Sequence, residues 1–238
     1  MQNQPIIDEI KTSLTAPEAF ELFRDRPYSF YLDSGMDEKK LGRYSFMGSD
    51  PFIILRSRGS DIELIRGEQV ESLKGNSFDV LGELLAKYKI EIDVLPVPFA
   101  GGAVGYLAYD LCHFIERLPS TAVNDLDLPE CYMGFYDAAV AYDHQENKVY
   151  IISTGFPEQG VAQESRKSAR LNELKEILSG SVSSNGEANK EISVDIQGNF
   201  THQQYLDAVQ ACREYIMAGD IFEVNLSQRF DTDLPIHS

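Results

Sequence analysis

The segment from residue 28 to residue 52 reads YSFYLDSGMDEKKLGRYSFMGSDPF, and its pattern indicates the kind of fold that the chain adopts. Its two ends are rich in aromatic residues, which favour strands, whereas its middle is charged. Turn-forming residues follow both aromatic runs, at Asp33-Ser34-Gly35 and at Ser49-Asp50-Pro51. We therefore predict two β-strands, at residues 28–33 and 43–48, joined by a charged loop.

Further strands are predicted on the carboxyl side of this pair. Residues 52–57 and 61–66 are apolar or β-branched runs separated by Arg58-Gly59-Ser60, which favours a turn. Residues 132–142 and 148–153 read as a hairpin. A meander or a mixed antiparallel sheet explains these runs most simply.

Helices are predicted between the strands. Thr15-Ala16-Pro17-Glu18 combines a capping box with an early proline, and Ser77 is predicted to cap a second helix with an apolar repeat of helical period. A third helix is expected at residues 164–178. A fourth should begin at the capping box of residues 201–204 and end at Gly219, which suits the left-handed conformation that follows a helix.

The chain is predicted to contain two domains joined by a linker. Residues 179–198 are rich in serine, glycine and asparagine and contain no aromatic residue, which is typical of a linker. Residues 1–178 would form the first domain. Residues 199–238 supply only one helix and one strand, too little for a core of their own. We therefore expect them to be the start of a second domain that is truncated here.

The composition excludes several classes of protein. The 238 residues include 21 basic and 38 acidic side chains, a formal net charge of −17 that disfavours nucleic-acid binding. The apolar runs are too short to cross a membrane, and the acidic amino terminus does not resemble a signal peptide. The 3 cysteines are widely spaced, as expected for buried thiols in the cytoplasm rather than for a disulfide framework or a zinc site.

Several polar groups are candidates for chemistry, each with a plainer alternative. Asp33 and Ser34 could hold an ammonium group, although spacing alone favours an Asx turn. The glycines of residues 101–105 could cradle a phosphate, but close packing of a glycine-rich strand fits their spacing better. Asp110, His113 and Glu116 could ligate a metal, yet a solvated helix face explains them as well.

The last apolar run, residues 221–230, is predicted to be a strand with one polar face. Alternation would place Asn225 and Ser227 on that face, together with Glu223 and Arg229. Such a face either meets water or lines a polar cavity, and the physical pattern leaves both readings open.

Three segments together resemble one known family. The family pattern is a strand ending in Leu-(Glu/Asp)-Ser and then G-R-Y-S-F-x-G-S-D-P; next P-F-x-G-G-x-x-G-Y-x-x-Y-D and E-x-L-P; and finally A-G-D-I-F-x-V-x-L-S-Q-R-F. Here these are residues 32–34 and 42–51, 98–110 and 116–119, and 218–230. The chain thus resembles the first component of anthranilate synthase and of aminodeoxychorismate synthase. The resemblance implies the α+β fold of the anthranilate synthase component I-like amino-terminal domain, with packed antiparallel or mixed β-sheets and outer helices.

The resemblance also implies a ligand site in the first domain. The family binds tryptophan there, and its Leu-Glu-Ser motif falls on Leu32-Asp33-Ser34. Asp33 and Ser34 become candidates to contact the tryptophan ammonium group, with Arg43 and Tyr44 as walls of the pocket. Aspartate is one methylene shorter than the usual glutamate. Asn225, where anthranilate synthases usually have valine, favours the folate-branch enzyme over anthranilate synthase.

For the reaction, the resemblance implies chemistry outside this chain. The family acts on magnesium-bound chorismate, using ammonia from a glutamine amidotransferase subunit. Its Mg²⁺-binding glutamates and acid–base residues lie in a carboxy-terminal domain with no counterpart before Ser238. We therefore name no catalytic or metal-binding residue and expect the chain alone to be inactive. The alternative class is a stand-alone tryptophan-binding regulatory module.

Overall fold

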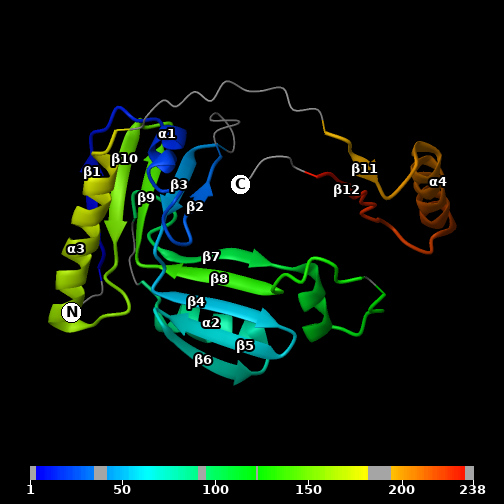
Figure 1. Ribbon diagram of the computed structural model, residues 1–238, viewed down its shortest axis with the longest axis horizontal. Coiled ribbons are helices and arrows are strands. Elements are labelled where there is room, and N and C mark those ends of the chain that lie inside the picture. The colour runs from blue at the N-terminus through cyan, green and yellow to red at the C-terminus, as the bar shows by residue number, and fades with distance from the viewer. Residues whose placement is uncertain (1–3, 35–41, 91–94, 122, 182–193, 234–238) are drawn as a thin grey trace. The chain divides into compact units, whose positions relative to one another are not determined.

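The computed structural model describes residues 4–34, 42–90, 95–121, 123–181 and 194–233, and Figure 1 shows their arrangement. The chain divides into two compact units, Met1–Ser183 and Ser184–Ser238. The linker predicted at residues 179–198 falls in part on residues 182–193, outside the described residues.

The first unit contains two five-stranded sheets in which every described pairing is antiparallel. The first sheet has the order β1-β10-β9-β3-β2. The second has the order β6-β5-β4-β8-β7, in which β4, β5 and β6 form a meander. The strand bounds in the first sheet are β1 Ile6–Ile10, β2 Phe30–Leu32, β3 Tyr44–Gly48, β9 Ala138–Asp143 and β10 Lys148–Ser153. Those in the second are β4 Ile53–Arg58, β5 Asp61–Arg66, β6 Gln69–Lys74, β7 Gly102–Leu107 and β8 Cys131–Tyr136.

The chain passes between the two sheets at Asp137. This residue separates β8, in the second sheet, from β9, in the first, and its side chain is fully buried. Figure 1 shows the strands of the two sheets running in crossing directions. Aromatic side chains fill the junction, where Phe30 of β2 packs edge-on against Tyr136 of β8 and Phe99 before β7. The two sheets therefore share one continuous interior at this corner.

Helices cover one face of each sheet. Helices α1 (Ala16–Glu21) and α3 (Gly160–Leu178) pack on the first sheet, where Phe23, Met47 and Leu174 are fully buried. Helix α2 (Ser77–Lys87) packs on the second sheet through Leu84. A short 3-10 helix, η2 (Tyr109–Phe114), follows β7. This arrangement of antiparallel sheets with outer helices is the predicted α+β fold.

Several predicted elements are confirmed, whereas others need correction. The Thr15 capping box is present, and β5 covers the predicted residues 61–66. The run 132–142 was predicted to be a single strand, which is wrong because buried Asp137 divides it between two sheets. Asn76, rather than Ser77, caps α2 by accepting a hydrogen bond from the Phe78 amide. Strands β1 and β6 were not predicted.

The second unit contains helix α4 (His202–Ala218) and two short strands, β11 (Gln197–Gly198) and β12 (Phe230–Asp231). The Thr201 capping box is present, and Gly219 ends the helix in the left-handed conformation, as predicted. The predicted strand at residues 221–230 is wrong except for its last residue, which pairs in β12. A strand requires a backbone partner, and in the described part of the chain residues 221–229 form no ladder.

Candidate functional site

The candidate site is organised by a chain of hydrogen bonds at the ends of three strands. The register pairs Leu32 with Phe46 and so brings the next residue, Asp33, opposite Ser45. Ser45 Oγ donates to Asp33 Oδ1 at 2.7 Å. The same oxygen lies 2.7 Å from Nε2 of His144, the residue that follows β9. Three residues that are distant in the sequence therefore form one connected group.

The direction of these hydrogen bonds follows from the chemistry of serine. A hydroxyl carries one proton, and here that proton is donated to the Asp33 carboxylate. Ser45 Oγ can then only accept from His144, so the imidazole must carry a proton on Nε2. His144 therefore donates a hydrogen bond to Ser45, and Ser45 donates one to Asp33.

A cavity of about 520 Å³ lies beside this group. Its walls are formed by the segment 12–17, by Tyr31 and Asp33 at the end of β2, and by Tyr142 and His144 at the end of β9. The Tyr31 hydroxyl oxygen is buried and has no hydrogen-bond partner of ordinary geometry among the described residues. A carboxylate, aromatic rings and a buried hydroxyl therefore border the same space, which suits a small ligand with an ammonium group.

The electrostatics keep both tyrosines protonated at neutral pH. Burial raises the pKa of the Tyr31 hydroxyl, and the nearby Asp33 carboxylate raises it further. Burial also raises the pKa of Tyr142 to about 12, and its hydroxyl donates to the Leu14 carbonyl at 3.3 Å. Both phenols therefore stay neutral, and Tyr142 acts as a hydrogen-bond donor.

A second polar group forms around Arg43. Its guanidinium donates to both carboxylate oxygens of Asp143, from Nε to Oδ1 at 3.0 Å and from Nη2 to Oδ2 at 2.6 Å. It also lies over the Tyr44 ring, 4.9 Å from the ring centre. Burial alone would raise the pKa of Asp143, but hydrogen bonds from Arg43 and from the backbone amides of Glu146 and Gln145 lower it below its ordinary value.

The four residues predicted for the ligand pocket therefore lie in different surroundings. Asp33 borders the cavity, whereas Arg43 is engaged with Asp143 and Tyr44 stacks on Phe46. Ser34 is exposed; continued alternation past β2 would turn it away from Asp33 and toward the face of Leu32. Ser45 and His144 were not predicted. Ser45 lies within the Gly-Arg-Tyr-Ser motif, but its contact with His144 depends on the pairing of β3 with β9.

The glycine-rich segment has the packing role that its spacing favoured. A side chain at Gly105 would place its Cβ 1.9 Å from the Tyr132 carbonyl oxygen on the neighbouring strand. Only glycine fits at that distance. The segment therefore brings β7 close to β8, and the alternative of a phosphate cradle gains no support from its geometry.

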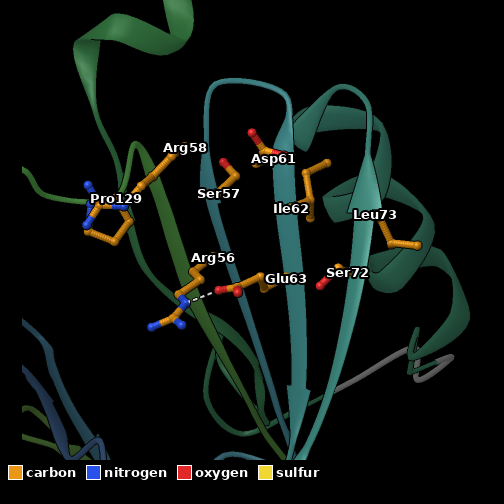
Figure 2. Close-up of a pocket in the computed structure, with 9 residues that line it drawn as sticks. All are labelled: Arg56, Ser57, Arg58, Asp61, Ile62, Glu63, Ser72, Leu73 and Pro129. Carbon is orange, nitrogen blue, oxygen red and sulfur yellow. Dashed lines mark hydrogen bonds and ion pairs between the residues drawn. The ribbon is translucent and has the colours of Figure 1, made fainter.

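A second hollow, of about 430 Å³, lies on the other sheet and is shown in Figure 2. Arg56 of β4 forms an ion pair with Glu63 of β5 there, and Arg58 lies beside Pro129. None of the predicted ligand residues lines it. Its charged walls are already paired, so it offers less to a ligand than the cavity at Asp33.

In the second unit, Asn225 and Ser227 are both exposed, as are Phe222 and Val224 before them. The predicted polar strand face is therefore absent, because these residues form no ladder that would separate two faces. Nor do the described residues bring three or more His, Cys, Asp or Glu side chains together in a group that could hold a metal ion. The Mg²⁺ site implied by the resemblance does not fit the residues described here.

The fold resembles that of a solved structure. The crystal structure of anthranilate synthase component I from Streptococcus pneumoniae TIGR4 matches with a TM-score of 0.61 and 23% identity, covering 79% of this chain and 41% of that one. This likeness confirms the predicted α+β architecture. In the part of the chain that the structure describes, no helix is long and apolar enough to cross a membrane.

Sequence comparison places the chain within a family. Residues 27–238 match the family described as chorismate binding enzyme, and the chain belongs to that family. Anthranilate synthase component 1 of Acetivibrio thermocellus is 32% identical over 94% of this chain and 47% of its own length. Aminodeoxychorismate synthase component 1 is 27% identical in Bacillus subtilis and 28% in Escherichia coli, over 43% and 46% of their lengths. The chain spans about half the length of the curated relatives that it matches.

Proposed function

We propose that this chain is the amino-terminal part of an aminodeoxychorismate synthase component I that acts in the cytoplasm. The complete enzyme would use chorismate, Mg²⁺ and ammonia from a glutamine amidotransferase to form 4-amino-4-deoxychorismate for folate synthesis. Family membership supports the substrate class. The observation that carries the choice of branch is Asn225, together with the Leu32-Asp33-Ser34-Gly35 sequence, both of which resemble the folate-branch enzymes more closely.

Anthranilate synthase component I is the second candidate, favoured by the relative with 32% identity. A deletion of the reading frame in its host separates the two branches. We expect p-aminobenzoate, and not tryptophan, to restore growth of the deletion strain. Rescue by tryptophan alone would assign the chain to anthranilate synthase. Growth without either supplement would favour the stand-alone regulatory module instead.

We further propose that residues 1–238 supply a ligand pocket and a scaffold rather than the chemistry. The described residues form no metal-binding group, and the hydrogen-bonded group at Asp33 presents no acid–base pair directed at a reacting atom. The purified polypeptide should therefore form no product from chorismate, ammonium and Mg²⁺. Product formation above that of a heat-denatured sample would overturn this assignment.

The pocket beside Asp33 is proposed to bind the ammonium group of L-tryptophan. The carboxylate, the tyrosine rings and the 520 Å³ volume support this ligand class. Calorimetry should show heat with the unaltered chain and at least ~10-fold weaker binding after Asp33→Asn, which removes the charge but keeps the shape. Glu83→Gln on the exposed face of α2 is the matched control. Equal affinities in Asp33→Asn and the unaltered chain would remove Asp33 from the site; Ser34→Ala tests the second predicted contact in the same way.

A further inference from the structure

The hydrogen-bonded group at Asp33 contains two residues whose role the proposed ligand site leaves open. We infer that Ser45 and His144 are positioning residues: they hold the Asp33 carboxylate toward the cavity, and the charge on His144 sets how strongly that carboxylate attracts a ligand ammonium group. The inference rests on the proposed amino-acid pocket. It adds a dependence of binding on the protonation of one histidine.

The geometry anchors Asp33 from two strands. Ser45 is fully buried on β3, so its hydroxyl has a fixed location. It contacts Asp33 on one side and His144 on the other, each at 2.7 Å. The His144 ring stacks on Tyr142, and its backbone amide donates to the Arg43 carbonyl at 2.8 Å. Asp33 itself is exposed, and its carboxylate is therefore accessible to a ligand while Ser45 restricts its rotation.

A charge on the His144 imidazole would act on the ligand site, because only Ser45 lies between His144 and Asp33. Neutral His144 already donates from Nε2, so protonation would add a proton at Nδ1 without breaking the hydrogen bond to Ser45. It would add a positive charge two hydrogen bonds from Asp33. That charge competes with a ligand ammonium for the same carboxylate, and we expect it to weaken binding by ~10-fold.

Among the described titratable groups around the site, an imidazole is the type of side chain that ordinarily changes charge near neutral pH. Carboxylic acids, phenols and basic side chains ordinarily change charge outside the range from pH 5.5 to 8, whereas imidazoles change within it. The described charged and titratable groups facing the site are Tyr31 of β2, Asp33 just after it, Arg43 before β3, Tyr142 and Asp143 of β9, Lys148 of β10, and Glu18 of α1 and Glu146 nearby.

Calorimetry with L-tryptophan between pH 5.5 and 8 tests the inference. The unaltered chain should lose ~10-fold in affinity toward pH 5.5. His144→Gln cannot gain a charge, so its affinity, whatever its value at pH 8, should stay the same down to pH 5.5. His113→Gln, on the distant helix η2, should keep the original profile. Ser45→Ala should bind more weakly at every pH, because Asp33 loses its fixed orientation.

The outcomes separate this inference from the proposed function. If His144→Gln keeps the same slope as the unaltered chain, the inference fails although tryptophan binds. If the unaltered chain binds no tryptophan at any pH, the proposed pocket fails. The link between His144 and Asp33 can then be measured without ligand, by recording the NMR signals of the His144 ring nitrogens at pH 8. Asp33→Asn should move the Nε2 signal, because the hydrogen bond from Ser45 changes; an unmoved signal would overturn the link as well.

Discussion

Arg43 and Asp143 form a two-point ion pair that connects the start of β3 with the end of β9, 100 residues later in the sequence. The Asp143 side chain is 2% exposed and that of Arg43 40%. The pair closes the first sheet at the end where Asp33, Ser45 and His144 meet. Arg43 thus stabilises the strand ends that carry the candidate site. Its place in the Gly-Arg-Tyr-Ser motif does not predict this contact with Asp143.

Arg43→Ala should lower the free energy of unfolding at pH 7, and the exposure of the arginine limits the size of this loss. The folded-state pKa of Asp143 is lowered, so its contribution is present above the unfolded value of about 3.9 and is lost as the pH falls through the folded value. Urea unfolding at pH 7 and pH 3 should therefore show a smaller deficit in acid.

The matched control is Arg66→Ala, which removes an exposed pair with Glu71 on the second sheet. It should change stability by no more than ~0.5 kcal/mol at either pH. A deficit for Arg43→Ala that is the same at pH 7 and pH 3 would show that lost packing, rather than the ion pair, explains the effect.

Local signals in the sequence correctly predicted the starts of α1 and α4 and the α+β class, whereas α2 is capped one residue earlier than predicted and α3 begins at Gly160 rather than at residue 164. The capping boxes at Thr15 and Thr201 involve residues only three positions apart, so their geometry is readable without tertiary structure. Strand β6 was missed because most of its residues are polar and almost all are exposed, and its two apolar residues do not alternate with polar ones. The prediction of a strand at residues 221–229 failed for the opposite reason: the sequence alternates there, but the described residues provide no partner strand.

The candidate site was only partly predictable for a similar reason. Asp33 was identified from a motif that surrounds it. Its contact with His144 through Ser45 depends on β3 lying between β2 and β9, an order that neither local propensity nor periodicity specifies. The division of residues 132–142 at Asp137 likewise depends on arginines from α3.

Asp137→Asn should be among the most destabilising polar substitutions in the chain. The carboxylate is fully buried and accepts from Arg166 Nε at 2.7 Å, with Arg170 Nε 3.4 Å away. Removing its charge takes away the carboxylate that pairs with Arg166 and one of the two carboxylates beside Arg170, which keeps its ion pair with Glu173, at a cost of ~3 kcal/mol. Asp61→Asn, whose carboxylate pairs with exposed Lys74, should cost less than ~0.5 kcal/mol. Similar urea midpoints for both variants would contradict the role of Asp137 at the corner.

Cys131 should be the least reactive of the three thiols. Burial raises its pKa to about 11, and its side chain is fully buried, whereas Cys112 and Cys212 are partly exposed. Because the thiolate is the reactive form, an aromatic disulfide reagent at pH 8 should modify Cys112 and Cys212 first. Cys131 should react at least ~100-fold more slowly until the chain is unfolded. Mass spectrometry of the labelled peptides identifies the sites, and early labelling of Cys131 would contradict its burial.

Gly105→Ala should disrupt the glycine-rich strand, whereas the same substitution at Gly82 should not. The new Cβ at position 105 would lie 1.9 Å from the Tyr132 carbonyl oxygen, so β7 must move away from β8. We expect a loss of at least ~2 kcal/mol, because backbone rather than a flexible side chain blocks the space. Gly82 lies within α2, where a Cβ would meet no atom within 4 Å, and alanine there should stabilise the helix by ~0.5 to 1 kcal/mol. Urea unfolding of both variants at pH 7 gives opposite signs if this packing is correct, and equal stability of Gly105→Ala and the unaltered chain would show that β7 does not need the close approach.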